Sequence, residues 1–395
     1  MQKKKISLGT VVSLMALTAA ATFVITLSMS RKQFNQTVTE VDRLAEKYQR
    51  LDELDAKVRE AFYQDVPEED VLDGMLSGYV AGLGDKYSVY RSDRELSAYE
   101  DNNAGVYTGI GISVRPDEEG NVIIVGVTEG GSAEKAGIAE EDILLEVEGV
   151  SAKESYQEAI SLINGEAGTS VQVRIKKHDT GKEQKLSLMR MKLDEVTVIS
   201  EMLPDKIGYI RISKFRNVSP AQFETARQDL LKQGAKAFLF DVRDNGGGVV
   251  SALEKMVDPL LPEGELAFAV NRNGEKQPIL TSDANCTEMP YAVLMNQNSA
   301  SSSELFACVL RDYADAILVG EKSYGKGIMQ TTFALSSGGL TITTSTIETG
   351  VTPCYHGVGL EPDVLSVYDP EQEEDNQIAD AVDALKARMK TDPAA

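Results

Sequence analysis

The sequence has only two histidines, His178 and His356, and no tryptophan among its 395 residues. A zinc hydrolase with several histidine ligands, or a Ser-His-Asp triad, would have to be built from these two side chains. His178 lies beside "DTGK", which indicates an exposed turn, and His356 stays open although no upstream pattern selects it. The shortage of histidine therefore directs the search for a catalytic base to other residue types.

Cysteine is also scarce. The three cysteines, Cys286, Cys308 and Cys354, lie far apart and form no CxxC pair, so the sequence predicts no disulfide framework of the kind found in small secreted proteins. Cys308 falls in an apolar helical run and is expected to be buried, whereas a Cys286–Cys354 bridge cannot be inferred. Neither a metal nor another cofactor is expected.

Basic residues are outnumbered, because 40 Lys and Arg stand against 62 Asp and Glu and give a net charge of −22. No basic patch could dominate such a field, which argues against nucleic acid as a partner. The composition, with 42% hydrophobic and 26% charged residues, is globular. A chain of 395 residues is too long for one ordinary core, so two or three folded units are expected.

An apolar run lies close to the N-terminus. Lys3, Lys4 and Lys5 precede 25 uncharged residues, Ile6–Ser30, which is enough to span a bilayer. The lysines favour a cytoplasmic tail at 1–5, a single-pass anchor in the cell membrane at 6–30, and an extracytoplasmic remainder. The alanines at 19–21 leave a cleaved signal peptide as the alternative, but the run continues beyond them as "FVITL", which favours an uncleaved anchor.

Residues 31–102 are expected to form a helical region. Pro67 and three acidic residues after it predict the start of one helix, and Ser92 with Glu95 predicts a capping box for another. Before them, apolar residues at three- and four-residue steps form a stripe that indicates a stalk or a dimer-forming helix: Val41, Leu44, Tyr48, Leu51, Leu54 and Val58.

The hydrophobic periodicity changes twice along the rest of the chain. Residues 103–192 contain short runs of Val, Ile and Leu bounded by Gly, Asn and Asp, which predict a mostly β module with one short and one longer helix. From 193 to 368 apolar strands alternate with helices, which predicts an α/β core with interior strands. The expected fold class is therefore α/β, in a multidomain α+β arrangement whose core has a mixed sheet.

The end of the chain adds two further elements. "MQTTFAL" and "GLTITTSTI" predict an antiparallel hairpin joined at residues 337–339. The C-terminal helical tail, 369–395, contains an amphipathic pattern that predicts a helix from about Glu371 to Lys390.

Two loops of the core, "DVRDNGGGVV" and "NQNSASSSELF", follow apolar strands and precede helices. Glycines 246–248 allow close backbone approach, and their N–H groups could cradle an oxyanion, although a glycine triplet alone is more often a tight turn. The second loop contains four serines between residues 299 and 303. Serine is a good helix cap, but it is also a nucleophile when a base takes its proton.

A lysine is the remaining candidate for that base. Its pKa in water is ~10.4, and burial can lower the pKa until a neutral amine accepts a proton. Lys326 in "EKSYGKGIMQ" lies between two glycines, which give its side chain room, although a lysine in a loop is usually an exposed surface residue. The match of residues 320–326 to the phosphate loop G-x-x-x-x-G-K lacks the following Ser or Thr, and we interpret it as accidental.

The block "NQNSASSSELFACVLRDYADAILVGEKSYGKGIMQ" resembles the active-site block of the carboxyl-terminal processing proteases, which are Ser-Lys serine peptidases. Their pattern is S-A-S-x-x-E followed by V-G-x-x-[ST]-[FY]-G-K-G-x-x-Q, and every marked position is present. The resemblance implies that Ser301 is the nucleophile, that Lys326 is the general base, and that Gln330 orients the lysine amine.

Three further stretches carry the resemblance over residues 60 to 368. "DVRDNGGG" is similar to the R-x-N-P-G-G loop of the family, with Gly246 in the usual proline position, and implies an oxyanion hole formed by the N–H groups of Gly247 and Ser302. "GLEPD" matches the closing motif. "YTGIGISV" through "SAEKAGIAEEDILLEVEG" resembles a PDZ module, which implies a peptide groove lined by Gly109, Ile110, Gly111 and Ile112.

One stretch departs from the family. "TIETGVTPCYHGVG" has Cys354, Tyr355 and His356 where the family has a Y-x-T-P-[SN]-G-R type sequence, so substrate contacts there are not carried over.

The expected function is that of a membrane-anchored extracytoplasmic serine endopeptidase. It would recognise protein or peptide C-termini through the PDZ module and cleave through an acyl-enzyme on Ser301; a homodimer stays open. The alternative is a PDZ peptide-binding scaffold with an inactive core, which loss of Ser301, Lys326 or Gln330 would support, and all three are present. A penicillin-binding type S-x-x-K enzyme is disfavoured because Glu304 stands where its lysine would be.

Overall fold

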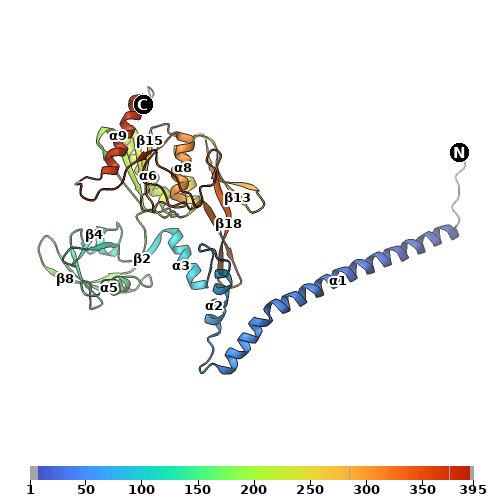
Figure 1. Ribbon diagram of the computed structural model, residues 1–395. Helices are drawn as coiled ribbons and strands as arrows, with labels where there is room; N and C mark the ends of the chain where they lie inside the picture. Colours follow the sequence, from blue (N-terminus) through green and yellow to red (C-terminus); the bar gives the residue numbers. More distant parts are fainter. Residues whose placement is uncertain (1–7, 284, 373, 392–395) are drawn as a thin grey trace. The chain divides into compact units, whose positions relative to one another are not determined.

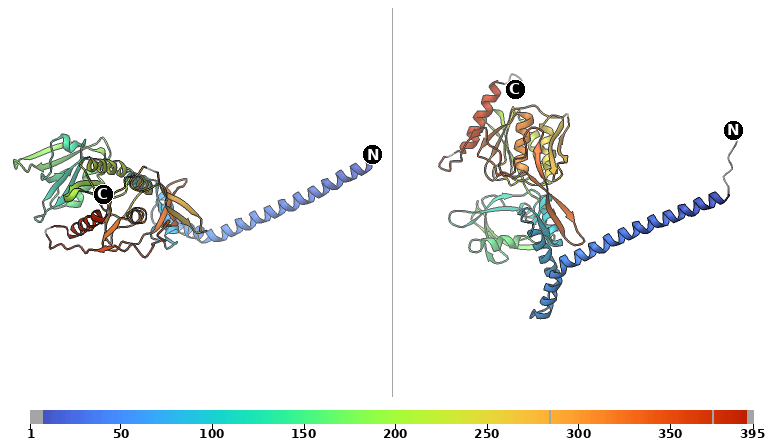
Figure 2. Two further views of the ribbon diagram at one scale, coloured as in Figure 1. Left: turned by 90° about the horizontal axis from the view of Figure 1, so that it is seen from above. Right: turned by 45° about the vertical axis from the view of Figure 1, so that its right-hand side comes forward.

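The computed structural model describes residues 8–283, 285–372 and 374–391 (Figures 1 and 2). The expected cytoplasmic tail, residues 1–5, lies outside the described residues. The chain divides into two compact units, Met1–Met75 and Leu76–Ala395.

The first unit is dominated by one long helix, α1 (Leu8–Ala61). Where the sequence predicts an anchor and a separate stalk, the helix runs without a break through both. Its segment Val11–Lys32 has a mean hydropathy of 2.0 and is long and apolar enough to cross a membrane, a test that a signal sequence also passes. A second helix, α2 (Glu68–Ala81), begins directly after Pro67 with acidic residues in its first turn, as predicted.

The β-rich module is an antiparallel sheet with the strand order β3-β4-β5-β7-β8, to which β6 adds beside β5. The sheet and its helices enclose a separate apolar core that includes Ile110, Ile124 and Val173. The elements of the module are β3 (Ile112–Pro116), β4 (Val122–Val127), α4 (Ser132–Lys135), β5 (Ile143–Val147), β6 (Val150–Ser151), α5 (Tyr156–Ile163), β7 (Ser170–Lys176) and β8 (Glu183–Met189).

The stretch "GVYTGIGISV" forms two strands rather than one. β2 (Val106–Gly109) pairs antiparallel with β9 (Met191–Asp194), and β3 begins only at Ile112. The break falls at Gly111, whose φ of +86° is unfavourable for residues with a side chain. A Cβ at this position would also lie 3.2 Å from the Gly131 Cα.

The α/β core is built on a six-stranded mixed sheet with the order β10-β11-β12-β15-β16-β19. β10 and β11 are antiparallel, and each later neighbour is parallel, which confirms the predicted α/β class. The strands are β10 (Val198–Leu203), β11 (Ile207–Ile212), β12 (Ala237–Asp241), β15 (Tyr291–Met295), β16 (Ile317–Gly320) and β19 (Val364–Leu365).

Helices cover both faces of this sheet (Figure 1). In β12 all five residues are buried; Phe238 and Phe240 pack on one side with α6, α7 and α8, and Leu239 packs on the other side with Leu385 of α9. This alternation is the expected period of two for a strand. The helices are α6 (Ser219–Lys232), α7 (Val250–Val257), α8 (Ser302–Ala314) and α9 (Asn376–Thr391).

A second, antiparallel sheet lies in the same core, with the order β1-β18-β13-β14 and with β17 beside β18. β17 and β18 form the predicted hairpin, and Gly338 takes a φ of +70° in its turn. The strands are β1 (Val89–Arg91), β13 (Gly264–Asn271), β14 (Lys276–Ser282), β17 (Ile328–Ala334) and β18 (Gly339–Thr349). Two short 3-10 turns, Pro204–Lys206 and Asp258–Leu260, complete the regular structure of the described residues.

Two helix starts follow from local hydrogen bonds. α3 (Asp93–Ala104) begins with the capping box that Ser92 and Glu95 predict. The last helix begins later than predicted, at Asn376 rather than near Glu371, because the Asp375 carboxylate accepts the N–H groups of Gln377 (3.0 Å) and Ile378 (3.3 Å).

Candidate active site

Three loops that follow neighbouring strands of the mixed sheet form the candidate site. The glycine loop (242–249) follows β12, the serine loop (296–301) follows β15, and the lysine loop (321–327) follows β16. The carboxyl ends of parallel strands lie at one edge of a sheet, so the loops meet there. They line a pocket of about 630 Å³ to which Gly247, Ser301, Ser302, Lys326 and Gln330 all contribute.

Ser301 has an unusual backbone conformation. It precedes the first residue of α8 with φ 58° and ψ −116°, a region in which a non-glycine residue is strained by on the order of 1–3 kcal/mol. Its N–H donates to the Glu304 carboxylate at 2.9 Å, which holds this conformation. Strain of this kind often accompanies a functional residue, and no sequence pattern predicts it.

The other three serines of the cluster bind the glycine loop. The hydroxyls of Ser299, Ser302 and Ser303 donate to the carbonyls of Val242 (2.8 Å), Gly248 (3.0 Å) and Asn245 (2.8 Å), respectively. The N-cap position of α8 is occupied by Ser301 itself rather than by Ser302 or Ser303. Among the four serines, Ser301 is the one whose hydroxyl does not bind the glycine loop.

The glycine loop approaches the serine loop very closely. Gly247 has a φ of +99°, and a Cβ there would lie 2.7 Å from the Ala300 carbonyl oxygen and 2.9 Å from the Ser302 nitrogen, so only glycine fits. Its N–H, a predicted oxyanion donor, donates to Asn245 Oδ1 at 2.9 Å. An oxyanion would therefore compete with Asn245 for this group, whereas the Ser302 N–H is among the leading amides of α8, which have no carbonyl partner one turn back.

Lys326 is half-buried in the pocket. Burial lowers the pKa of its amine, and the nearby positive charge of Lys86 adds to the decrease, while Tyr324, Asp85 and Glu304 oppose it. The Nζ atom lies 4.6 Å from the centroid of the Tyr87 ring. The direction of the pKa shift is the one that a general base requires.

The predicted dyad is not hydrogen-bonded in this conformation. Within the described residues, no hydrogen bond joins Ser301 Oγ to Lys326 Nζ, and the Gln330 side chain is hydrogen-bonded to Thr343 Oγ1, to which its Nε2 donates at 3.1 Å, and not to the lysine. Catalytic hydrogen bonds are often long in free enzymes and tighten when substrate binds. The roles of Ser301, Lys326 and Gln330 remain predictions.

A cluster of residues from a distant segment surrounds the lysine amine. Lys86 Nζ donates to Tyr324 Oη at 2.8 Å, across 238 positions of the chain, and Tyr87 presents its ring to Lys326. Asp85 accepts the Ser88 hydroxyl at 2.6 Å, which fixes the turn. The sequence contains no local signal for these contacts, because they depend on how the segment packs on the core.

Glu304 connects the serine and lysine loops. Its side chain is completely buried and accepts four donors: the N–H groups of Ser301 (2.9 Å), Lys326 (2.7 Å) and Gly325 (2.6 Å), and the Ser323 hydroxyl (2.5 Å). A buried carboxylate needs such donors. The spacing of Ser301 and Glu304 resembles a capping box, which is the signal that could have identified this residue.

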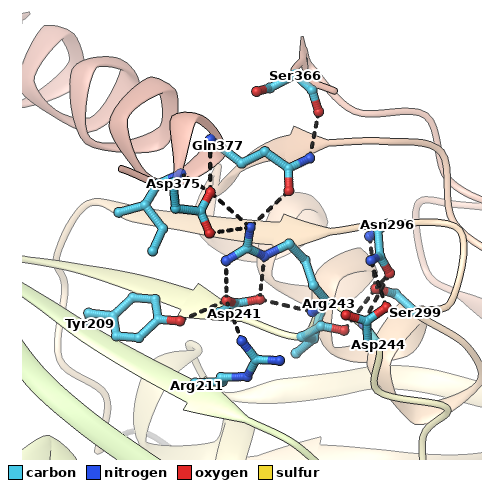
Figure 3. Close-up of polar contacts among 12 residues, drawn as sticks. Tyr209, Arg211, Asp241, Arg243, Asp244, Asn296, Ser299, Ser366, Asp375 and Gln377 are labelled. Atoms are coloured by element: carbon cyan, nitrogen blue, oxygen red, sulfur yellow. Dashed lines mark hydrogen bonds and ion pairs between the residues drawn. The ribbon is translucent and has the colours of Figure 1, made fainter. Parts of the chain in front are cut away.

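The glycine loop is held by a different buried carboxylate, Asp241 (Figure 3). Asp241 accepts the Tyr209 hydroxyl at 2.7 Å and the Arg243 guanidinium at 2.7 and 3.0 Å. The other side of the guanidinium reaches the start of α9, where it contacts Asp375, just before the helix, at 2.8 Å and Gln377 Oε1, on the helix, at 2.8 Å. A buried arginine therefore joins the glycine loop to the C-terminal helix, a contact that the sequence does not indicate.

The predicted peptide groove lies in the β-rich module. Gly109, Ile110, Gly111 and Ile112 line a second pocket, of about 150 Å³, together with Ile160, Ile163 and Asn164 on or next to α5. The Gly111 carbonyl accepts the Thr128 N–H at 2.9 Å, which fixes the loop between β2 and β3.

The scarce residues take no part in the main pocket. His178 is exposed as predicted, and His356 is exposed and does not line the pocket. The three cysteines are free thiols; Cys308 is buried as predicted, and burial raises the pKa of its thiol to about 12. Across the described ranges, no group of three His, Cys, Asp or Glu side chains is arranged to hold a metal ion.

Comparison with known proteins gives two family matches. The model of peptidase family S41 matches residues 206–366, and that of the PDZ domain matches residues 123–177. The carboxy-terminal processing protease CtpA of Bacillus subtilis (strain 168) is 29% identical over 321 residues, which cover 80% of this chain and 68% of the relative. The carboxyl-terminal-processing protease of Synechocystis sp. is 33% identical over 267 residues, which cover 66% of this chain and 62% of the relative.

A solved structure of a C-terminal processing protease is also similar to this chain. The photosystem II D1 C-terminal processing protease has 26% sequence identity and a TM-score of 0.50, and the alignment covers 87% of this chain and 90% of that chain.

Proposed function

Because this chain belongs to the C-terminal processing proteases of peptidase family S41 and carries a PDZ domain, we propose that it cleaves peptide bonds through an acyl-enzyme on Ser301, with Lys326 as the general base. The observation that carries this proposal is that Ser301, with its strained backbone, and Lys326, with its lowered pKa, line one pocket beside the glycine loop.

The chemistry follows from these groups. Neutral Lys326 takes the proton of the Ser301 hydroxyl while the oxygen attacks the scissile carbonyl. The Ser302 N–H, together with the Gly247 N–H when it leaves Asn245, stabilises the oxyanion; one such donor is typically worth ~3 kcal/mol. Protonated Lys326 then gives its proton to the leaving amine, and a water molecule activated in the same way hydrolyses the ester and restores Ser301.

Two residues would position the base. The buried Glu304 carboxylate holds the Lys326 and Ser301 backbone amides at 2.7 and 2.9 Å, and so fixes the two reacting side chains relative to each other. Gln330 lines the same pocket, and we assign it the role of orienting the lysine amine when substrate is bound.

The PDZ domain would select the substrate. The loop at residues 109–112 would receive a chain-terminal carboxylate on its N–H groups, while the last residues of the substrate add to the sheet edge. We assign the PDZ domain to residues 103–192, the protease core to 193–368 and the helical tail to 369–395.

The apolar segment Val11–Lys32 supports a single-pass anchor, with the helical region at 31–102 and the catalytic core outside the cytoplasm. Alkaline extraction of membranes from cells expressing the chain tests this placement. Protein that stays in the membrane and is digested by an added protease from the outer side supports it, and release as a shortened soluble form favours a cleaved signal peptide.

Removal of the dyad tests the catalytic assignment. Ser301→Ala and Lys326→Ala should each reduce cleavage of a peptide substrate by about 10⁴-fold or more while circular dichroism spectra stay unchanged. The measurement is kcat/KM for a fluorogenic peptide with a free C-terminus, and trimmed C-termini in proteomes with and without Ser301→Ala identify natural substrates. Full activity in either variant would refute the dyad, and tight binding without cleavage by the wild type would favour a scaffold.

A further inference from the structure

The active-site pocket is positively charged in a strongly acidic protein. Three of the described residues that line it are cationic, Lys214, Arg216 and Lys326, and none of those lining residues is Asp or Glu. The chain as a whole has a net charge of −22. If Lys326 is neutral as the base, Lys214 and Arg216 remain as the source of the positive potential in the pocket.

The backbone directs both of these side chains toward the pocket. The Phe215 N–H donates to the Gly247 carbonyl at 3.3 Å, and the Phe215 carbonyl accepts the Val249 N–H at 2.9 Å, so residue 215 pairs with the glycine loop like a short strand. Phe215 is completely buried in the core. Because successive side chains of a strand point to opposite sides, Lys214 and Arg216 face away from the core, where they line the pocket.

The charge of these two cations is only partly neutralised. Both share one carboxylate, that of Glu195, which lies 2.5 Å from Lys214 Nζ but 3.6 Å from Arg216 Nε. The second distance exceeds that of a hydrogen bond. The Arg216 Nε atom is buried without any hydrogen-bond partner, and its side chain is 13% exposed.

A buried guanidinium N–H without an acceptor is unfavourable, and an acceptor brought by a ligand would satisfy the Nε–H of Arg216. Guanidinium groups bind carboxylates through two parallel hydrogen bonds. Lys214, whose side chain is 45% exposed, would add a second positive charge beside the same ligand. The shape and charge of this part of the pocket thus fit a substrate carboxylate.

We propose that Arg216 and Lys214 form a subsite for a carboxylate of the substrate, and that the protease prefers an acidic side chain close to the cleaved bond. The inference rests on the proposed function, because it assigns a specificity to that same pocket. The substrate's own C-terminal carboxylate is the other source of this chemistry, but in the proposed function that group occupies the PDZ groove.

The test compares pairs of peptides with one cleavage site and one free C-terminal sequence. Within a pair, Glu is replaced by Gln at a single position, and pairs cover four positions on each side of the cleaved bond. For at least one position, the wild type should cleave the Glu peptide with a kcat/KM about tenfold higher, because a charge-assisted hydrogen bond is stronger than a neutral one. In Arg216→Gln the ratio should fall to about one, and Arg216→Glu should favour a Lys peptide instead.

Two further variants keep the test decisive. Lys214→Gln should reduce the ratio less than Arg216→Gln does, because its side chain is more exposed, and it decides the question if Arg216→Gln does not fold. Lys232→Gln removes an exposed cation that pairs with Asp229 on α6, and it should leave the ratio as in the wild type. A ratio near one at every position in the wild type overturns the proposal, as does a preference that persists in both pocket variants.

A second set of peptides, with free or amidated C-termini, separates the two sources of the carboxylate. If Arg216→Gln removes a preference for free termini while the Glu and Gln peptides are cleaved equally, the subsite binds the chain terminus and the preference for an acidic side chain is refuted. Cleavage that depends on Ser301 but ignores the Glu residue refutes only this subsite. A wild type that cleaves none of the peptides contradicts the proposed function itself.

Discussion

The serine loop and the glycine loop are each held by a buried carboxylate, but the two charges are neutralised in different ways. Glu304 accepts four neutral donors, three of them backbone N–H groups. Asp241 instead faces the guanidinium of Arg243. The first arrangement fixes two loops at short range, whereas the second extends through Arg243 to Asp375, the residue directly before α9.

This difference between Glu304 and Asp241 indicates what holds the serine and lysine loops in place, and what holds the glycine loop. The backbone positions of Ser301 and Lys326 both depend on the Glu304 side chain, so a change there affects both residues of the proposed dyad. The glycine loop depends on a counter-ion and, through that counter-ion, on a helix that lies outside the region matched by the family S41 model. We therefore expect the two carboxylates to respond differently to substitution.

Of the substitutions that separate the two carboxylates, that of Glu304 should have the largest effect on cleavage. Glu304→Gln places an amide N–H₂ group against N–H donors, which leaves donors unsatisfied at about 1–3 kcal/mol each and displaces both reacting loops. We expect kcat to fall about a hundredfold and the melting temperature to fall with it. Kinetics on a fluorogenic peptide and thermal denaturation provide the measurements.

The structure offers a matched control for this variant. Glu95 has the same capping relationship to Ser92 that Glu304 has to Ser301, with a distance of 2.9 Å to the Ser92 N–H, but it is exposed. Glu95→Gln should reduce stability by about 1 kcal/mol or less and leave kcat unchanged. Equal effects of the two substitutions would show that Glu304 acts only as a helix cap.

Substitution of Arg243 follows, and its main effect should be on the stability of the fold. Arg243→Gln removes the hydrogen-bonded counter-ion of the buried Asp241 carboxylate and leaves only Arg211 at 3.8 Å; breaking a buried ion pair typically destabilises a protein by about 3–5 kcal/mol. The double variant Asp241→Asn/Arg243→Gln should recover part of this loss, and Asp375→Asn alone should reduce stability by only about 1 kcal/mol, because Asp375 is 27% exposed. Urea denaturation measures the free energy of unfolding of all three variants. A double variant that is less stable than Arg243→Gln would argue against the pairing of Asp241 with Arg243.

The smallest expected effect concerns pH dependence. In the proposed mechanism cleavage needs neutral Lys326, so kcat/KM should rise as pH rises through the pKa of its amine. The positive charge of Lys86 lowers this pKa and the negative charge of Asp85 raises it. Lys86→Gln should therefore shift the acidic limb of the pH profile to higher pH, and Asp85→Asn should shift it to lower pH.

The test compares the pH profiles of Lys86→Gln and Asp85→Asn. Shifts of opposite sign assign the acidic limb to a group between these charges. Shifts of the same sign, or an acidic limb that moves in neither variant, would mean that another group controls it.

The sequence predicts the parts of the site that depend on local pattern. Apolar runs followed by Gly or Ser clusters indicate the β12 and β15 loops, and the mixed sheet, the hairpin and the α3 capping box are confirmed. The pairing of Ser301 with Lys326 came from a resemblance to a family rather than from the physics of the residues. The resemblance also marked Glu304 but gave it no role.

The remaining features depend on tertiary packing and have no local signal. The bond between Lys86 and Tyr324 joins residues 238 positions apart. The bond from Gly247 to Asn245 Oδ1 uses an amide that the family pattern assigns to the oxyanion. The contact of Arg243 with α9 could be predicted only if it were known on which face of the sheet the last helix packs.

The packing of α9 has a practical consequence for anyone who prepares a shorter catalytic fragment. Ala381 and Leu385 of this helix cover the apolar side chains of Ile207, Leu239 and Leu294 on one face of the sheet. A recombinant fragment that ended where the family S41 match ends, at residue 366, would expose that face to water and is expected to aggregate. Fragments should therefore extend through Thr391.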